Sequence, residues 1–267
     1  MDELKQIFGR LWIDYCKKSP SAKKIKMSLI QCGNFVINDH VAIRTFDLPQ
    51  VNIETIATPF INSGYKEKAS YEFKEKKLIA KHFEHKDFKD APKVFISQLK
   101  TNECSQFLQD FIHKLIGDIM KYKLNPDYLI YQGRLWDELS YKTYKKVLKE
   151  SEYAAWLYIN GFCANHFTIS VNHLRSIQTL EQMNIFLKNQ NYKLNKSGGE
   201  IKGSPEIFLE QSSIMADKIP IKFIEGEKEV PSCYYEFAYR YNLPNGELFN
   251  GFVVDSADKI FESTDNK

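Results

Sequence analysis

Cysteine is scarce in this sequence, and its pattern excludes two kinds of small scaffold. The chain has 267 residues and only five cysteines. They are odd in number and widely spaced, and no two of them form a C-x-x-C pair. We therefore expect neither a disulfide framework nor a structural zinc site, and we predict a reducing compartment, the cytoplasm.

Long apolar runs are also missing. The longest, near residues 154–164, is interrupted by Asn160 and Gly161 and is too short to cross a bilayer. The first residues alternate between polar and apolar side chains, which is not the pattern of a secretory signal. We therefore predict a protein that neither spans a membrane nor is secreted.

A large excess of charge of one sign is absent as well. Lysine and arginine total 37, aspartate and glutamate total 34, and the formal net charge is +3. This near-balance argues against nucleic acid as a main partner. Hydrophobic residues make up 43% of the chain and aromatic residues 14%, so a large core can form. We expect a single domain over residues 1–267, built from two closely packed halves.

The spacing of apolar residues predicts the same order of elements twice. Residues 1–25 contain an N-terminal helix that ends at Ser19 and Pro20. In the first module, residues 36–100, elements are expected at 38–47, 51–61, 69–73, 78–83 and 92–99. In the second module with its C-terminal tail, residues 161–267, elements are expected at 164–171, 179–188, 206–210, 219–224 and 233–240. Each set has the order strand, helix and three strands.

A helical insertion, residues 101–160, lies between the two modules. Helices are expected at 103–122 and 140–159, and packing against the outside of a sheet is their simplest role. The sequence therefore predicts an α+β fold of two paired β-α-β-β-β modules. Their sheets are expected to curl around one shared cavity, which is a natural place for a ligand.

Two histidines occupy equivalent positions in the two modules. His40 and His166 each lie on the first strand of their module. A lone histidine on an apolar strand is more often part of a core than a metal ligand, but the repeat favours a shared site. Glu236 lies between aromatic residues on the last strand, where a glutamate is rarely buried unless it is paired or bound to a cation. Two histidines and one carboxylate form the facial triad of non-haem Fe(II) enzymes.

The other histidines are less suited to the same site. His173 follows His166 by seven residues, an odd number, so the two would face opposite sides of one strand. His82 and His85 are also separated by an odd number, and we predict that they are structural or exposed. His113 lies one position off a helical core stripe, and we expect no role in chemistry for it.

Two arginines are candidates for binding an acidic substrate. Arg44 shares a strand face with His40, about 13 Å further along. Its guanidinium is always charged and can bind a carboxylate through two hydrogen bonds, which predicts a substrate with one end on the metal and the other on the arginine. Arg240 stands in the same relation to Glu236. A salt bridge at a strand end stays open as the alternative for both arginines.

Four sequence motifs resemble those of a known enzyme family. They are HVAIR at residues 40–44, NHFT at 165–168, YEFA at 235–238 and SADKIFEST at 256–264. With them, the chain resembles the iron-dependent 2-oxoadipate dioxygenase/decarboxylase family, also called hydroxyglutarate synthase. This resemblance implies a vicinal-oxygen-chelate-like core, which agrees with the two paired modules.

The resemblance also implies roles for the candidate residues. His40, His166 and Glu236 would hold Fe(II), and Arg44 would be the catalytic arginine that binds the substrate carboxylate, with Arg240 as a second substrate-binding candidate. The expected reaction converts a 2-oxo dicarboxylic acid such as 2-oxoadipate, with dioxygen, to 2-hydroxyglutarate and CO2. Two alternatives remain: another metalloenzyme on the same core, such as a glyoxalase-like isomerase or an extradiol dioxygenase, and a binding module without turnover.

Overall fold

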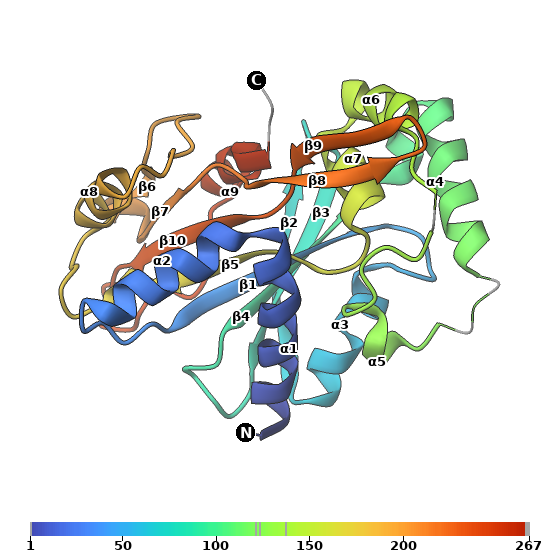
Figure 1. The fold of residues 1–267 in the computed structure, drawn as a ribbon. Coiled ribbons are helices and arrows are strands. Elements are labelled where there is room, and N and C mark those ends of the chain that lie inside the picture. The colour runs from blue at the N-terminus through green and yellow to red at the C-terminus, as the bar shows by residue number, and fades with distance from the viewer. Residues whose placement is uncertain (1, 121, 123, 137, 265–267) are drawn as a thin grey trace.

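A computed structural model describes residues 2–120, 122, 124–136 and 138–264 (Figure 1). Eight strands form one sheet in the order β2-β3-β4-β1-β5-β10-β7-β6. Their bounds are β1 (Asn38–Phe46), β2 (Tyr65–Phe73), β3 (Leu78–His85), β4 (Lys93–Leu99), β5 (Ala164–Ser170), β6 (Lys202–Ser204), β7 (Leu209–Ser213) and β10 (Tyr234–Arg240). The helices are α1 (Asp2–Lys18), α2 (Pro20–Gln31), α3 (Ile53–Asn62), α4 (Gln106–Ile119), α5 (Pro126–Leu129), α6 (Tyr141–Glu150), α7 (Glu152–Asn160), α8 (Leu180–Asn189) and α9 (Val254–Phe261).

The two halves of the sheet repeat one pattern of strand pairing. In each half the first strand lies parallel to the last, β1 beside β4 and β5 beside β10. The two first strands, β1 and β5, then pair antiparallel in the middle of the sheet. The paired β-α-β-β-β arrangement expected from the sequence is therefore present, and it places the two histidine-bearing strands side by side.

The sheet is strongly curled, and α9 closes its open side. Eight flat strands would hold the two edges about 34 Å apart, whereas an eight-residue helix is only about 12 Å long. Yet α9 packs against β2 at one edge and against β6 at the other. The rings of Phe261 on α9 and Phe73 on β2 are 5.2 Å apart. Side chains on the concave face of the sheet are therefore enclosed.

The convex face of the central strands is covered by α1 and α2, which cross it in Figure 1. Helix α1 presents Trp12 and Tyr15 to this face. Trp12 packs edge-on against Phe167 of β5 at 5.2 Å and lies 5.7 Å from the ring of Tyr235 on β10. Because side chains alternate along a strand, His166 and Glu236 point to the opposite, concave face.

The N-terminal region contains one helix more than expected, α2, and the insertion contains two more, because α5 was missed and one expected helix is divided. Residues 20–31 form α2, whose first residue is Pro20; proline is well suited to this position because its missing N–H has no partner there anyway. The helix expected at 140–159 is broken at Ser151 into α6 and α7. The Ser151 side chain accepts a hydrogen bond from the Ala154 amide and so begins a new helix.

The second module differs from expectation in its strands. Residues 205–207 form a 3-10 turn, and β7 begins only at Leu209, after Phe208 with a φ of +61°. The strand expected at 219–224 is β8 (Lys218–Phe223), which pairs with β9 (Gly226–Pro231) in a separate hairpin. Pro220 lacks an amide hydrogen and the lysines of β8 are exposed, which suits a hairpin outside the main sheet. The short strand β6, missed from the sequence, takes the edge position.

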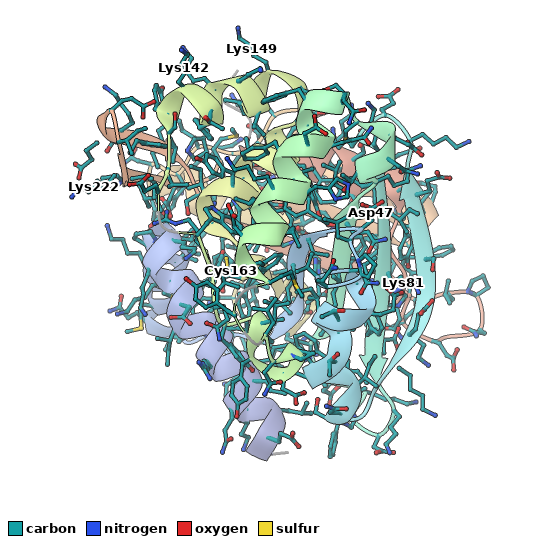
Figure 2. All side chains as sticks on the ribbon, turned by 90° about the vertical axis from the view of Figure 1, so that its right-hand side faces the viewer. Asp47, Lys81, Lys142, Lys149, Cys163 and Lys222 are labelled. Carbon is teal, nitrogen blue, oxygen red and sulfur yellow. The ribbon has the colours of Figure 1, made fainter. Side chains whose placement is uncertain are left out.

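The insertion does not lie wholly on the outside of the sheet, where it was expected, because α7 reaches the concave face. There the Tyr153 hydroxyl bonds that of Ser97, which aligns with Arg44. Glu152 also accepts a hydrogen bond from Arg44. Figure 2 shows Lys142 and Lys149 of α6 pointing away from the molecule. Helix α4 spans Gln106–Ile119 within the range expected for it, and Lys121 of that range lies outside the described residues. Across the described part of the chain, no helix has the length and apolar character needed to cross a membrane.

Candidate metal centre

Three candidate ligands converge on the concave face of the sheet. His40 on β1, His166 on β5 and Glu236 on β10 come from three neighbouring strands. One ligand atom from each can be chosen so that all lie within 4.8 Å of one another. His166 Nε2 lies 3.1 Å from one carboxylate oxygen of Glu236, and His40 Nε2 lies 3.6 Å from the other. All three residues are buried, so the two modules do build one shared cluster.

Strand register explains why residues so distant in the chain meet. His40 and Glu236 both align with Thr168 of β5, one from each side. His166 is two residues before Thr168 on the same strand and the same face. The Thr168 hydroxyl lies 3.0 Å from His40 Nε2. The cluster therefore follows from the pairing of β5 with both neighbours.

Each histidine is oriented by the side chain that precedes it in sequence. His40 Nδ1 lies 2.7 Å from a carboxylate oxygen of Asp39, and His166 Nδ1 lies 3.0 Å from the amide oxygen of Asn165. An Nδ1–H that donates to these oxygens leaves Nε2 with a free lone pair, which is the state a metal requires. Sequence reasoning missed both supporting residues, although an Asp-His and an Asn-His pair at equivalent positions could have indicated them.

The protonation states in the cluster follow from burial and from neighbouring charges. Burial acts to raise the pKa of Glu236, but the nearby His40 and His166, with a hydrogen bond from Gln211, bring it below its usual value. Burial lowers the pKa of His166 despite the attraction of Glu236. A buried carboxylate beside a neutral imidazole is the donor set that divalent transition metals bind.

The residues present fit a metal ion. Among the residues that the structure describes, Glu236 is in ion-pair range of the two histidines alone. Its Oε2 atom is buried and has no hydrogen-bond partner. A buried carboxylate without a permanent cation is unfavourable, and a bound cation would remove that penalty. Two imidazole nitrogens and one carboxylate suit Fe(II) and leave coordination positions open.

Gln211 and Tyr234 complete the surroundings and were missed from the sequence. The Gln211 amide nitrogen donates a 2.6 Å hydrogen bond to Glu236, while its own oxygen is buried and unpaired. The ring of Tyr234 stacks on His166 with centroids 4.6 Å apart, and its hydroxyl is also buried and unpaired. Burial raises the pKa of Tyr234 well above its usual value, so the hydroxyl keeps its proton.

Arg44 lies on the concave face, further along β1, and is fully buried. Its Nη1 donates to both carboxylate oxygens of Glu152, at 3.0 and 3.2 Å. Its Nη2 donates to Thr264, and its Nε has no partner. The guanidinium also lies 5.0 Å from the ring of Tyr153 and 5.7 Å from that of Phe261. Its expected binding of a substrate carboxylate stays a prediction, and Glu152 occupies its Nη1 in this structure.

Arg240 forms a different kind of pair. Two of its nitrogens donate to the Asp39 carboxylate at 2.7 and 2.8 Å, and Nη1 donates to the carbonyls of Phe249 and Gly251. Burial acts to raise the pKa of Asp39, but Arg240 holds it well below its usual value. The salt bridge that the sequence left open as an alternative is thus present. It is linked to the cluster because Asp39 also bonds Nδ1 of His40. Substrate binding by Arg240 stays a prediction.

The remaining histidines have structural or exposed positions. His82 is buried, with Nδ1 near the Tyr71 hydroxyl at 2.8 Å and Nε2 near Glu84 at 3.1 Å. His85 Nδ1 accepts from the backbone amides at residues 87 and 88. His173 is exposed in a 3-10 turn just after β5. None of these three histidines is part of the cluster of His40, His166 and Glu236, as expected. His173 lies past the end of β5, so strand parity is not tested for it.

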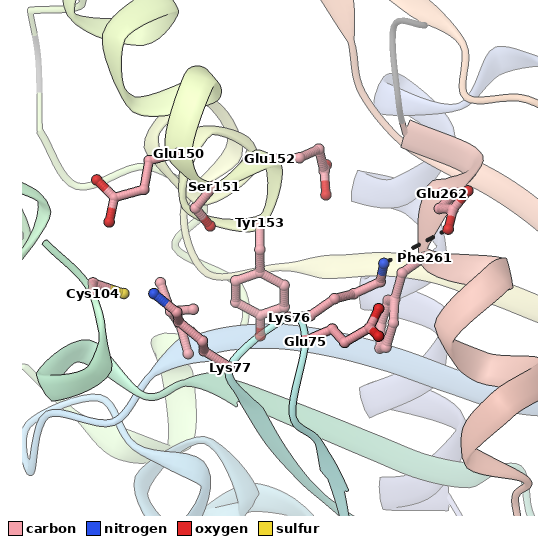
Figure 3. A pocket seen from close by; sticks show the side chains of 11 residues that line it. Glu75, Lys76, Lys77, Cys104, Glu150, Ser151, Glu152, Tyr153, Phe261 and Glu262 are labelled. Carbon is pink, nitrogen blue, oxygen red and sulfur yellow. Dashed lines mark ion pairs between the residues drawn. The ribbon is translucent and has the colours of Figure 1, made fainter.

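A surface cavity reaches the neighbourhood of Arg44. Its volume is about 210 Å³, and Glu152, Tyr153 and Phe261, which all contact Arg44, form part of its wall. Figure 3 shows Glu152 and Tyr153 on one side of this cavity, with Phe261 across from them beside the ion pair of Lys76 and Glu262. The cavity therefore brings solvent to Glu152, the partner of Arg44, while Arg44 itself stays buried.

Comparisons with known proteins identify relatives over nearly the whole chain. A model of the family described as 2-oxoadipate dioxygenase/decarboxylase matches residues 130–249. A relative from Oryza sativa named 2-oxoadipate dioxygenase/decarboxylase, chloroplastic/amyloplastic, is 36% identical over 94% of this chain and 76% of its own length. The solved structure of hydroxyglutarate synthase from Oryza sativa, in complex with 2-oxoadipate, is 34% identical, with a TM-score of 0.90 over 98% of this chain and 92% of that chain.

Two further solved structures bear on the fold. A Shewanella frigidimarina protein described as a hydrolase is 47% identical, with a TM-score of 0.86 over 94% of this chain and 98% of that one. A glyoxalase-superfamily protein from Ralstonia eutropha is 17% identical, with a TM-score of 0.73 over 94% and 85% of the chains, and shares the fold alone. The expected α+β, vicinal-oxygen-chelate-like fold is confirmed. The cytoplasmic location stays a prediction, since the name of the Oryza relative places that protein in plastids.

Proposed function

Because this chain belongs to the 2-oxoadipate dioxygenase/decarboxylase family of enzymes, we propose that it oxidatively decarboxylates a 2-oxo dicarboxylic acid at an Fe(II) centre. The six-carbon acid 2-oxoadipate and dioxygen would give 2-hydroxyglutarate and CO2. The observation that carries this proposal is the buried cluster of His40, His166 and Glu236 with Arg44 on the same face of β1. A metal site and a carboxylate site joined by one enclosed surface suit a substrate with an acidic group at each end.

His40, His166 and Glu236 would hold the iron. Asp39 and Asn165 keep the two imidazoles turned with Nε2 toward Glu236, and Gln211 holds one oxygen of that carboxylate. These contacts fix the donors before any ion arrives, so little side-chain freedom is lost on binding. When bound, Fe(II) supplies the redox chemistry that activates dioxygen, which amino-acid side chains cannot provide.

Arg44 would bind the distal carboxylate of the substrate. Its guanidinium already binds the carboxylate of Glu152 in a two-oxygen arrangement. Because Glu152 lies in the wall of the surface cavity and its side chain is 22% exposed, it can turn toward solvent when a substrate carboxylate replaces it. Holding both ends of the acid fixes the reacting carbon near the metal donors, and such positioning lowers the entropic barrier.

Aromatic rings cover the metal side of the site. Phe252, from the segment that follows β10, packs edge-on against His40 at 4.9 Å, and its ring lies 4.9 Å from that of Phe95 on β4. The carbonyls of Phe249 and Gly251, which accept from Arg240, hold this segment in place. Excluding water protects a reactive oxidation from side reactions with solvent.

The test combines metal content with turnover. Protein purified without oxygen and loaded with Fe(II) is screened against a panel of 2-oxo acids for oxygen uptake and CO2 release. We expect both in equal amounts with 2-oxoadipate and an iron content near one per chain. His166→Ala and Glu236→Ala should lose the iron. Iron content unchanged in these variants would refute the triad, and isomerisation or catechol cleavage without CO2 release would favour the rival activities.

A further inference from the structure

The concave surface between the metal cluster and Arg44 is formed by one row of residues. Strand register places Ala42, His166 and Tyr234 side by side on β1, β5 and β10. Glu236 lies two residues after Tyr234 on β10, on one side of this row. Arg44 lies two residues after Ala42 on β1, on the other side, because β1 runs antiparallel to β5. A ligand that reaches from the cluster to Arg44 must therefore pass over this middle row.

Within the row, Tyr234 offers the free polar group. Ala42 contributes one methyl group and so leaves space above the strand. His166 directs its Nε2 to Glu236. The Tyr234 ring is fixed by stacking on His166, while its hydroxyl is buried without a hydrogen-bond partner. An unpaired buried hydroxyl is unfavourable, so this group is suited to a ligand that brings an acceptor.

The surroundings of this hydroxyl point to an anionic acceptor near Arg44. Strand register places Tyr234 in the row between that of Glu236 and that of Arg44, so its side chain lies between the two ends of the site. Glu152 marks the position where Arg44 binds a carboxylate in this structure. Arg44 Nε is also buried without a hydrogen-bond partner, so the arginine has a free donor as well.

We propose that Tyr234 is a substrate-specificity residue whose hydroxyl donates a hydrogen bond to the distal carboxylate bound by Arg44. This inference rests on the proposed function, because it takes the ligand to be a 2-oxo acid with a second carboxylate. A carboxylate has room for several donors, so the tyrosine hydroxyl and the guanidinium can bind it together. A 2-oxo acid that lacks the distal carboxylate would leave the hydroxyl unpaired.

The chain contains a matched control on the same strand. Tyr235 is also fully buried and its hydroxyl is also unpaired, but it faces the opposite side of the sheet, where Trp12 and Tyr15 pack. Tyr234→Phe and Tyr235→Phe therefore remove the same atom at the same depth from neighbouring residues. A general effect of losing a buried hydroxyl would appear in both variants, whereas an effect on substrate selection would appear in Tyr234→Phe alone.

The experiment measures binding of 2-oxoadipate and of 2-oxohexanoate, its monocarboxylic counterpart, to Fe(II)-loaded protein by calorimetry without oxygen. Tyr234→Phe should weaken 2-oxoadipate binding by roughly tenfold or more, the usual effect of one hydrogen bond to a charged group. Its binding of 2-oxohexanoate and its iron content should stay as in the unmodified protein. Tyr235→Phe should bind both acids as the unmodified protein does.

The outcomes separate this inference from the proposed function. If the unmodified protein does not bind 2-oxoadipate, both fail. If it binds and Tyr234→Phe matches Tyr235→Phe, only the role of Tyr234 fails. The inference would also be overturned if Tyr234→Phe weakened the binding of both acids equally or lowered the iron content. The hydroxyl would then support the metal cluster rather than select the substrate.

Discussion

Two buried arginines with the same sequence offset have different kinds of partner. Arg44 and Arg240 each follow a candidate metal ligand by four residues on one strand. Arg44 pairs with Glu152, whose side chain is 22% exposed and borders a surface cavity. Arg240 pairs with Asp39, whose side chain is 4% exposed and also holds His40.

This contrast in solvent exposure indicates which arginine can exchange its partner. A carboxylate at the wall of a cavity can be replaced by that of a substrate, because water solvates it after it leaves. A carboxylate enclosed with its arginine cannot leave without exposing two unpaired charges to a low-dielectric interior. We therefore expect Arg44 to act on the substrate, and Arg240 to act on the metal site through Asp39 and His40.

Removing Arg240 should have the largest effect on the protein. Arg240→Ala leaves the Asp39 carboxylate buried without a cation, and breaking such a pair costs about 3–5 kcal/mol. We expect a free energy of unfolding lower by about that amount, measured by urea denaturation, together with weaker iron binding. Unchanged stability would contradict a locked ion pair.

A double variant separates the fold from the metal site. Asp39→Asn with Arg240→Met removes both charges, so much of the stability should return, since replacing both partners is often neutral. His40 then lacks its charged acceptor, and iron affinity should stay weaker by roughly 10- to 100-fold. Full recovery of iron affinity would show that Asp39 does not orient His40.

Removing Arg44 should affect the substrate more than the fold. Arg44→Ala should lower kcat/KM for 2-oxoadipate by about 10- to 100-fold, because a charge-assisted hydrogen bond contributes about 1.5–3 kcal/mol. Arg44→Lys keeps the charge but cannot bind a carboxylate through two parallel bonds. Its kcat/KM should therefore lie between those of the unmodified protein and Arg44→Ala. Equal losses with 2-oxohexanoate would contradict a role in binding the distal carboxylate.

Replacing Glu152, the partner of Arg44, should have the smallest effect on catalysis. Glu152→Gln removes the carboxylate that competes for Arg44, so KM for 2-oxoadipate should fall by about two- to fivefold, the range of a partly exposed ion pair. Glu150→Gln is the control, because Glu150 lines the same cavity but bonds Ser105 instead of Arg44. A rise in KM for Glu152→Gln would mean that Glu152 positions the arginine rather than competing for it.

Strand parity and residue type were sufficient to select the residues that the structure brings together. His40, His166 and Glu236 were chosen because they are polar side chains on apolar strands of two equivalent modules, and a strand has a fixed period of two. The same parity argument set His173 aside, but that residue lies past the end of β5, so parity is not tested for it. Their role as iron ligands remains a prediction.

Other parts of the site could not be found in this way. Gln211 lies on β7, whose start was misplaced because Phe208 adopts a left-handed conformation that composition does not indicate. Glu152 lies at the start of α7, a helix that was merged with its neighbour. Phe252 comes from a segment outside the regular elements, so no periodicity places it. Each reaches the site through packing between elements distant in sequence.

Spacing along the chain was enough to predict most strands and helices, the side chains that share a strand face, and the presence of two similar modules in succession. These depend on spacing between near neighbours, which is set by backbone geometry. Which arginine has a partner close to solvent could be learned only from the folded structure. That depends on where Glu152 and Asp39 lie relative to solvent, and solvent access is set by the curl of the whole sheet and by the helix that closes it.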